Sequence, residues 1–134
     1  MYIKVFILQK RTVRLICGIP PKYHCKPLFI DLGILTLPSM YVLHCLLYVK
    51  DNLNTFTVCS NIHNYATRNS LNIYSNKFKY TKIQNSFIAV AVKLFNSLPQ
   101  KLRELPISTF KRTIRHTLVA NPLYTVNEFF NVSF

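Results

Sequence analysis

Aromatic and basic side chains alternate along residues 63–82, and these two residue types together suit one kind of chemistry. Cations neutralise phosphates while aromatic faces stack on unpaired bases, so the mixture predicts contact with RNA or single-stranded DNA. The alternative is that the aromatics pack this segment onto neighbouring helices and the lysines only face solvent. The residues concerned are Tyr65, Tyr74, Phe78 and Tyr80 with Arg68, Lys77, Lys79 and Lys82.

The chain as a whole is strongly basic. Its 134 residues include 17 Lys and Arg but four Asp and Glu, which gives a formal net charge of +13. Half of the residues are hydrophobic, so the chain can form a core and does not have the composition of a disordered basic tail. A folded domain with this charge attracts polyanions, and the aromatic content favours nucleic acid among them.

The scarcity of acids argues against catalysis by this chain. Polymerases and nucleases hold metal ions between converging carboxylates, but Asp31, Asp51, Glu104 and Glu128 are scattered along the sequence. The chain has two glycines and neither a Walker nor a dinucleotide-binding pattern, so no phosphate-binding glycine loop is expected. We therefore expect no catalytic residue, no cofactor and no enzymatic activity.

Four cysteines raise the question of zinc or disulfides. Zinc sites usually take their ligands from close pairs such as CxxC, and this sequence has no such pair. In the dipeptides His24-Cys25 and His44-Cys45 the residues are adjacent, so their side chains point in different directions. We expect no bound metal and a reduced, intracellular protein in which Cys17, Cys45 and Cys59 behave as small apolar side chains.

Residues 32–49 are apolar enough to resemble a membrane span. Gly33 and Pro38 interrupt the run, however, and His44 lies inside it. A buried helix explains this composition better than a span, which needs about 20 predominantly apolar residues. We therefore expect no membrane partner.

Helical periodicity dominates the first half of the chain. Residues 3–17 predict a helix that ends at Gly18. Its expected apolar face contains Val5, Phe6, Val13, Ile16 and Cys17, and its expected basic face contains Lys4, Lys10, Arg11 and Arg14. After a short turn of helix at 27–32, Ser39 is the expected N-cap of a second helix, 40–50, which is apolar on nearly every side. A long, Asn-rich loop follows at 51–84.

Two further helices are expected in the second half. Asn85 or Ser86 caps the first, which ends near Ser97, and Ser108 or Thr109 caps the second, 108–119. Their expected apolar faces consist of Phe87, Val90, Ala91, Leu94 and Leu98, and of Ile107, Phe110, Ile114 and Leu118. The faces opposite these contain Lys93, Asn96 and Ser97, and Lys111, Arg112, Arg115 and His116. A last short turn is expected at 125–130. The predicted fold is mainly α, an irregular bundle of about four helices with a long loop at 51–84, formed as a single region over 1–134.

The candidate nucleic-acid contacts combine the loop with the basic faces of the first and last helices. Such residues ordinarily form a solvated surface. The alternative hypothesis is that they line a groove that binds the phosphates of a nucleic acid. Ten bases against one acid between Arg68 and Arg115 favour the groove. The predicted nucleic-acid-binding residues are Lys10, Arg11, Arg14, His63, Tyr65, Arg68, Lys77, Lys79, Tyr80, Lys111, Arg112 and Arg115.

An ordered series of short motifs then connects this chain with a known family. The series consists of Leu8-Gln9-Lys10-Arg11, Arg14-Leu15-Ile16-Cys17-Gly18, Cys25-Lys26-Pro27-Leu28-Phe29, Leu32-Gly33-Ile34-Leu35-Thr36-Leu37-Pro38-Ser39, His63-Asn64-Tyr65-Ala66-Thr67-Arg68-Asn69, Leu94-Phe95-Asn96-Ser97-Leu98-Pro99, Phe110-Lys111 and Leu123-Tyr124-Thr125-Val126-Asn127-Glu128-Phe129. In order and spacing it resembles the region after the polymerase domain in non-LTR (LINE-like, jockey-like) retrotransposon reverse transcriptases. The resemblance covers essentially the whole chain.

The resemblance implies a fragment rather than a whole enzyme. Proteins of that family carry an endonuclease and a polymerase palm with paired aspartates, followed by a helical thumb and tail. This sequence has no Asp-Asp dipeptide and no CCHC zinc knuckle. The resemblance therefore implies the thumb and tail region of an RNA-directed DNA polymerase, whose partners are template RNA or DNA and the upstream polymerase domains.

The family's functional residues are not carried over, with one exception. The His-x-Tyr-x-Thr-Arg pattern matches His63, Tyr65, Thr67 and Arg68. These types suit a base stacked on Tyr65 and a phosphate at Arg68, and a structural role that ties the loop to the helices is equally open. Two hypotheses follow for the chain: a non-catalytic tail that contacts nucleic acid, or a structural remnant that packs on a missing polymerase domain and binds nothing alone.

Overall fold

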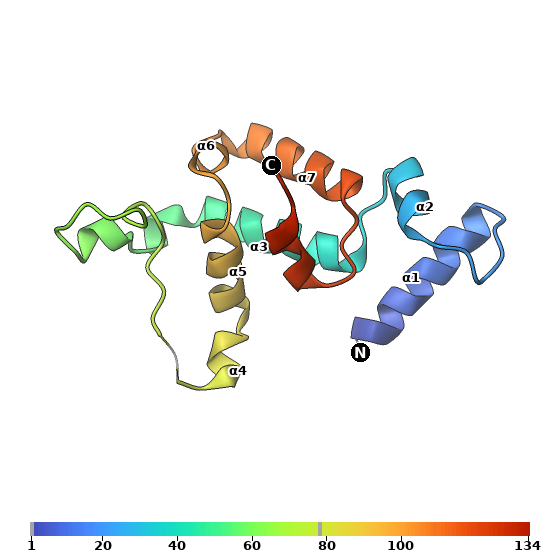
Figure 1. Cartoon of the computed structure of the whole chain (residues 1–134), viewed down its shortest axis with the longest axis horizontal. Coiled ribbons are helices and arrows are strands. Elements are labelled where there is room, and N and C mark those ends of the chain that lie inside the picture. Colours follow the sequence, from blue (N-terminus) through green and yellow to red (C-terminus); the bar gives the residue numbers. More distant parts are fainter. Residues whose placement is uncertain (1, 78) are drawn as a thin grey trace. The chain divides into compact units, whose positions relative to one another are not determined.

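The computed structural model describes residues 2–77 and 79–134, and within them the chain is mainly helical, as predicted (Figure 1). Helices, 3-10 turns included, account for 61% of the structure. The longer helices are α1 (Tyr2–Ile16), α3 (Leu37–Asp51), α5 (Phe87–Asn96) and α7 (Ile107–Ala120). The shorter elements are α2 (Lys26–Asp31), α4 (Thr81–Gln84), α6 (Gln100–Arg103), η1 (Leu53–Thr55), η2 (Cys59–Asn61) and η3 (Val126–Asn131). Phe78, one of the aromatics predicted to contact bases, lies outside the described residues.

The chain forms two compact units. Unit 1 consists of Met1–Leu43 and Arg112–Ser133, and unit 2 consists of His44–Lys111 together with Phe134. Helices α3 and α7 each contribute residues to both units.

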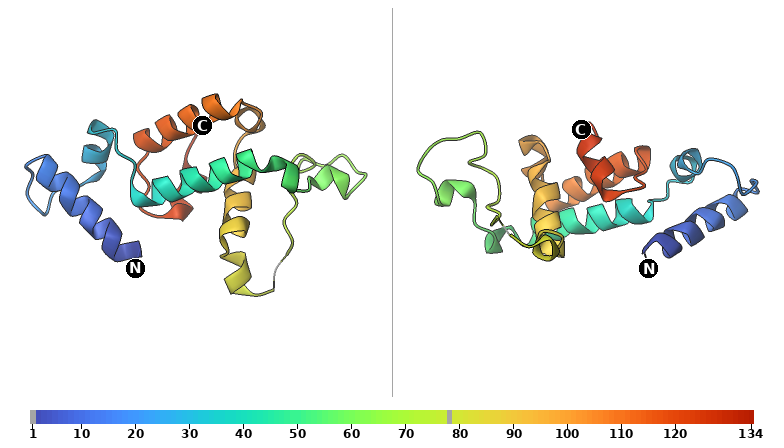
Figure 2. Two further views of the ribbon diagram at one scale, coloured as in Figure 1. Left: turned by 180° about the vertical axis from the view of Figure 1, so that it is seen from behind. Right: turned by 60° about the horizontal axis from the view of Figure 1, so that its bottom comes forward.

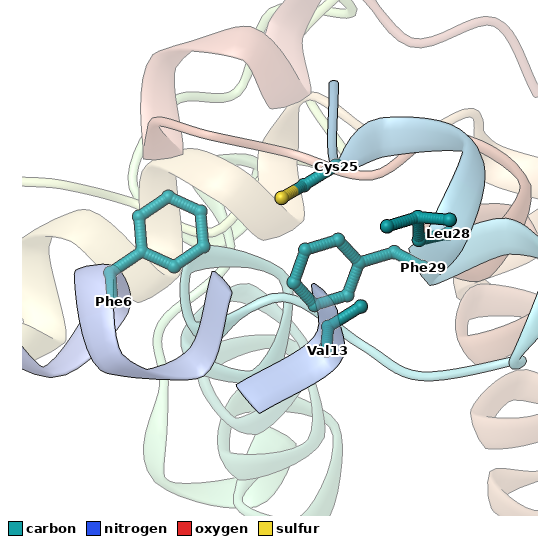
Figure 3. Packing of buried hydrophobic residues seen from close by; sticks show 5 residues of the cluster. All are labelled: Phe6, Val13, Cys25, Leu28 and Phe29. Atoms are coloured by element: carbon teal, nitrogen blue, oxygen red, sulfur yellow. The ribbon is translucent and has the colours of Figure 1, made fainter. Parts of the chain in front are cut away.

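In unit 1, α1 and α2 pack through a small hydrophobic cluster of Phe6, Val13, Cys25, Leu28 and Phe29 (Figure 3). Figure 3 shows the two side chains from α1 directed toward those from α2 and from Cys25 just before it. Burial of apolar surface stabilises this contact at about 25 cal/mol per Å². The thiol of Cys25 is buried among these apolar groups, and its Sγ lies 3.8 Å from the carbonyl oxygen of Lys10.

Both glycines of the chain end a helix in this unit. Gly18 follows α1 with φ of 63°, and Gly33 follows α2 with φ of 64°. The next residue in each case donates its N–H back to the last turn, from Ile19 to Arg14 (2.9 Å) and from Ile34 to Phe29 (3.0 Å). This is the Schellman arrangement, in which a glycine adopts the left-handed conformation that other residues rarely tolerate. The predicted end of the first helix at Gly18 is confirmed.

The predicted faces of α1 are wrong in part. Phe6 and Val13 are buried as expected, but Val5 and Ile16 are exposed. Leu8 and Leu15 are exposed as well, and the exposed fraction of Leu15 is 81%. The reason is that α2 and the residues before it cover only a narrow strip of α1, so the buried arc is smaller than the apolar pattern suggests.

A buried network of hydroxyl groups holds residue 123 to the start of α3. The Thr36 hydroxyl donates to the Leu123 carbonyl at 2.5 Å and lies 2.9 Å from the Ser39 hydroxyl, which in turn accepts from the Leu123 N–H at 3.2 Å. Thr36 also accepts from the Ser39 N–H at 3.3 Å. Thr36 is therefore the residue that caps α3, and the prediction of Ser39 as the N-cap is wrong by three positions.

Gln9 binds the same region from α1. Its amide nitrogen donates to the Leu35 carbonyl at 2.9 Å, and its amide oxygen accepts from the Leu37 N–H at 2.9 Å. One side chain thus satisfies two backbone groups of the segment that joins α2 to α3.

In unit 2, helix α5 forms as predicted and Ser86 caps it, since the Ser86 hydroxyl accepts from the Ala89 N–H at 3.4 Å. The prediction of a cap for the last helix is wrong, because α7 already includes Ile107, ahead of Ser108 and Thr109. Of the expected apolar face of α7, Phe110, Ile114 and Leu118 are fully buried, whereas Ile107 at the start of the helix is exposed.

The predicted loop 51–84 contains a narrow antiparallel ribbon. Residue 58 forms a bridge with residue 73, and backbone hydrogen bonds join Cys59 to Asn72 (2.9 Å) and Ser60 to Ser70 (2.9 Å). The segment after the ribbon runs antiparallel beside α5, as both Figure 1 and Figure 2 show. Asn96 of α5 fixes this arrangement: its side chain donates to the Ile73 carbonyl and accepts from the Ile73 N–H, each at 2.9 Å.

Candidate nucleic-acid interface

The tip of the ribbon carries the first group of predicted contacts. His63, Tyr65 and Arg68 all lie in the connection between its two arms, and all are exposed. The exposed fraction of Tyr65 is 83%. Within the described part of the chain, none of these three side chains forms a hydrogen bond, ion pair or ring contact. They are therefore available to a ligand, and Arg68 does not tie the loop to the helices.

The second group lies just before α4. Lys77, Lys79 and Tyr80 are exposed, with an exposed fraction of 69% for Tyr80. Tyr80 also precedes α4 in extended conformation, so its backbone positions the start of that helix. Two lysines thus lie close in sequence to an exposed tyrosine ring, and proteins that bind single-stranded nucleic acids use this combination of residues.

The structure does not bring the two groups together. The tip, 62–69, lies between the two arms of the ribbon, whereas Lys77, Lys79 and Tyr80 follow its second arm at the other end, since residues 58–60 pair with 70–73. The expectation of one continuous groove along residues 63–82 is therefore replaced by two separate patches in unit 2.

The three predicted contacts on the basic face of α1 differ in their exposure and in their partners. Arg11 is exposed, whereas Lys10 and Arg14 are half-buried and already have partners. The Lys10 ammonium lies 4.8 Å from the ring centroid of Phe6, and the Arg14 Nε donates to the Tyr23 carbonyl at 3.1 Å. Cation–π contacts of this kind stabilise the fold by about 0.5–1 kcal/mol at exposed sites. Of the three predicted contacts on α1, Arg11 is the one left without a partner in the described structure.

On α7, Lys111, Arg112 and Arg115 are all exposed, as predicted. Their spacing places Arg112 and Arg115 next to each other on the helix surface, with His116 beside them. No described acidic side chain forms an ion pair with any of these bases. The outer face of α7 thus carries charge that the protein itself does not neutralise.

Both units are basic in nearly equal measure. Unit 1 contains eight bases and two acids, and unit 2 contains nine bases and two acids. The bases of unit 1 are Lys4, Lys10, Arg11, Arg14, Lys22, Lys26, Arg112 and Arg115, and its acids are Asp31 and Glu128. Those of unit 2 are Lys50, Arg68, Lys77, Lys79, Lys82, Lys93, Lys101, Arg103 and Lys111, with Asp51 and Glu104.

Two bases of unit 2 outside the predicted contacts, Lys50 and Arg103, are half-buried. Lys50 donates to the Arg103 carbonyl and lies 5.5 Å from the ring centroid of Phe110, while the Arg103 Nη1 donates to the Asn72 side chain at 2.9 Å. Burial lowers the pKa of both basic groups, and the charge of Glu104 partly opposes that shift. Arg103 thus holds the ribbon at Asn72, and Lys50 binds the end of α6 and the ring of Phe110, so both residues have structural partners.

Glu128 of unit 1 is held by several hydrogen-bond donors. It forms an ion pair with Lys26 at 3.4 Å and accepts from the Tyr124 N–H at 3.3 Å and the Thr125 hydroxyl at 3.3 Å. Burial alone raises the pKa of Glu128, but these donors outweigh burial and lower the pKa below its usual 4.5.

Because its pKa is lowered in the folded protein, Glu128 should make a contribution to stability that depends on pH. A depressed pKa stabilises the folded state above about pH 4.5, and that contribution is lost as the pH falls through the folded-state pKa. We expect Glu128→Gln to lower the free energy of unfolding at neutral pH and to approach the parent protein in acid. Urea denaturation at several pH values measures the difference. A difference that stayed constant from about pH 7 to about pH 3 would contradict this assignment.

Comparison of the chain with protein-family models, with curated proteins and with solved structures found no match. Among the helices of residues 2–77 and 79–134, none has the length and apolar character to cross a membrane. Within the same residues, no three His, Cys, Asp or Glu side chains are grouped so as to hold a metal ion. All four cysteines are among the described residues, and none forms a disulfide.

Proposed function

We propose that this chain is a non-catalytic, nucleic-acid-contacting tail of a non-LTR retrotransposon reverse transcriptase, and that it acts inside the cell. In the parent polymerase it helps to hold template RNA or primer near the catalytic domain. The observation that supports this most directly is the exposure of basic and aromatic side chains without partners among the described residues in two patches of unit 2. One patch consists of His63, Tyr65 and Arg68, and the other of Lys77, Lys79 and Tyr80. The ordered motifs described above support the parentage.

The geometry favours contact with phosphates and bases over a purely solvated surface. Tyr65 and Tyr80 present their rings to solvent, where an unpaired base can stack on them. Each stands within a few residues of an unpaired cation, Arg68 or Lys79. Phosphate contacts would position the strand, and stacking would be tolerant of sequence, as in other single-strand binders.

Salt-dependent binding to a single-stranded RNA oligomer tests this function. We expect the affinity, measured by fluorescence anisotropy, to fall steeply between about 50 mM and about 200 mM salt, because phosphate contacts release counterions. The triple variant Arg68→Gln, Lys79→Gln, Arg115→Gln should reduce the slope of log affinity against log salt by roughly two, at about 0.7 per lost contact.

A matched control removes the same charge elsewhere. The variant Lys4→Gln, Lys22→Gln, Lys101→Gln loses three exposed bases that are not among the predicted contacts, so it should keep most of the slope. Equal losses in the two triple variants would indicate a diffuse charge effect. If binding of the RNA oligomer were undetectable at about 50 mM salt, the proposed nucleic-acid function would be wrong.

The parentage has a separate test in the DNA upstream of this reading frame. A reading frame there that encodes a palm with paired aspartates would support the proposal, and its absence over several kilobases would count heavily against it.

A second candidate is a structural remnant whose surface normally packs on the missing polymerase. The observation that favours it is the exposed apolar surface of α1, where Ile3, Leu8, Leu15 and Ile16 all have more than half of their area in solvent. This candidate predicts no salt-dependent RNA affinity and self-association at higher protein concentration. The binding experiment above therefore separates the two functions.

A further inference from the structure

A polar cavity of about 480 Å³ lies between the segment 75–77 and one side of α5 in unit 2. Lys77 and Lys93 line it together with the side-chain amides of Asn76 and Asn85, and no described lining residue is acidic. The side chains of Asn76, Lys77 and Asn85 form no hydrogen bond or ion pair within the described part of the chain. Cations and uncommitted amides around one space are the groups that bind a phosphate.

A second cavity, of about 300 Å³, has a different lining. Phe56 and Tyr74 contribute aromatic rings to it, and Ile88 and Val92 contribute aliphatic side chains from α5. Tyr74 is exposed, so part of its surface is free to receive a ligand. A planar ring that enters this space can stack on an aromatic face, an interaction worth roughly 1–3 kcal/mol per base in single-strand binders.

The two cavities adjoin each other. Ser75, Asn76 and Ala89 line both of them, so one ligand can extend across the shared wall. The arrangement follows from the path of the chain, because the segment that begins at Ile73 is held against α5 by Asn96 (Figure 2). Their sizes fall at the lower end of the range for small-molecule sites, roughly 300–1,000 Å³.

We propose that the paired cavities hold one unstacked nucleotide of a single-stranded nucleic acid, with its phosphate at Lys77 and Lys93 and its base against Tyr74 and Phe56. This deepens the function proposed above and rests on it for the source of the nucleotide. The nucleotide is the class of ligand that joins an anion to an aromatic plane over a short distance, as the two linings require. Asn96 contributes only a wall, since both ends of its amide are already bonded to Ile73.

Titration of the full chain with uridine 5′-monophosphate at low salt tests the site directly. We expect saturable shifts in the two-dimensional NMR spectrum at residues of the segment 74–77 and of α5. Inorganic phosphate should bind at least about tenfold more weakly, because it cannot use the aromatic cavity. Tyr74→Leu should weaken binding of the nucleotide by roughly 5- to 150-fold and leave binding of phosphate unchanged. Lys77→Gln should weaken both.

Two control variants replace the same residue types outside the cavities. Tyr23→Leu and Lys101→Gln alter an exposed tyrosine and an exposed lysine that line neither cavity, and both should bind the nucleotide like the parent protein. If Tyr74→Leu lost helical circular dichroism, the exposed Lys77→Gln would decide. Equal affinity for nucleotide and phosphate, or no effect of Tyr74→Leu and Lys77→Gln, would overturn the site.

The outcomes separate this inference from the proposed function. Salt-dependent RNA binding without nucleotide binding would overturn the paired cavities and leave the tail function standing. Nucleotide binding that responds to both variants, without affinity for RNA oligomers, would support the cavities and count against the tail function.

Discussion

Replacement of Phe29 by alanine should lower the free energy of unfolding by about 3–5 kcal/mol, the largest effect that we expect from one substitution. Phe29 is fully buried in the cluster that joins α1 to α2, beside Val13 and Leu28 (Figure 3). Its removal loses the transfer free energy of a phenyl ring and leaves a cavity that the narrow contact of two helices cannot refill.

The neighbouring residue provides the control for this prediction. Ile30→Ala changes an exposed side chain on the same short helix and should change stability by less than about 1 kcal/mol. Urea denaturation followed by far-ultraviolet circular dichroism compares the two variants with the parent. A loss of stability for Phe29→Ala no larger than that of Ile30→Ala would show that the α1–α2 cluster does not hold unit 1 together.

Thr36→Val should destabilise the protein by about 2–4 kcal/mol although it barely changes the volume of the side chain. The Thr36 hydroxyl is fully buried and bonds the Leu123 carbonyl, the Ser39 hydroxyl and the Ser39 N–H. With valine, the Leu123 carbonyl and the Ser39 N–H lose partners in a place that water does not reach, at roughly 1–3 kcal/mol for each unsatisfied group.

Thr36→Ser separates the hydroxyl from the methyl group. Serine keeps the hydrogen bonds and removes one buried methyl, so its cost should be about 1 kcal/mol. The same denaturation experiment ranks the two variants. If serine proved more damaging than valine, packing of the methyl group and not the hydroxyl network would explain the burial of Thr36.

The helices were predictable because their signals are local. Gly18 ends α1, Ser86 caps α5, and the apolar spacing of Phe110, Ile114 and Leu118 identifies the buried side of α7. Each of these signals depends on residues within one or two turns of each other. The mainly helical fold class follows from them directly.

Two of the errors share a physical cause, since they concern polar side chains that contact residues far along the chain. Ser39 looks like a cap in the sequence, but Thr36 takes that place because its hydroxyl also reaches Leu123, 87 positions away. Lys10 looks like a solvated base, yet its ammonium also lies 5.3 Å from the ring centroid of Tyr124, which is far along the chain. Partners so far along the chain leave no periodic trace.

The sequence indicated which residue types form the candidate site, but it did not indicate which of these residues lie close together. The residue types of Tyr65, Arg68 and Lys77 indicated an interface, and their exposure agrees with that role. The position of Lys93 opposite Lys77 could not be read, because it depends on the bond between Asn96 and Ile73, 23 positions away. The spacing of Ala89, Lys93 and Asn96 along one side of α5 was the available signal.

The even distribution of bases between the two units bears on folding itself. Compaction crowds eight bases against two acids in one unit and nine against two in the other, so like charges repel within each folded unit. Salt screens this repulsion, so moderate salt should raise the melting temperature of the folded chain. In proteins that depend on surface ion pairs, salt has the opposite effect. A polyanion that binds the folded chain neutralises the same bases. Its binding therefore stabilises the folded state, and folding and binding are thermodynamically coupled.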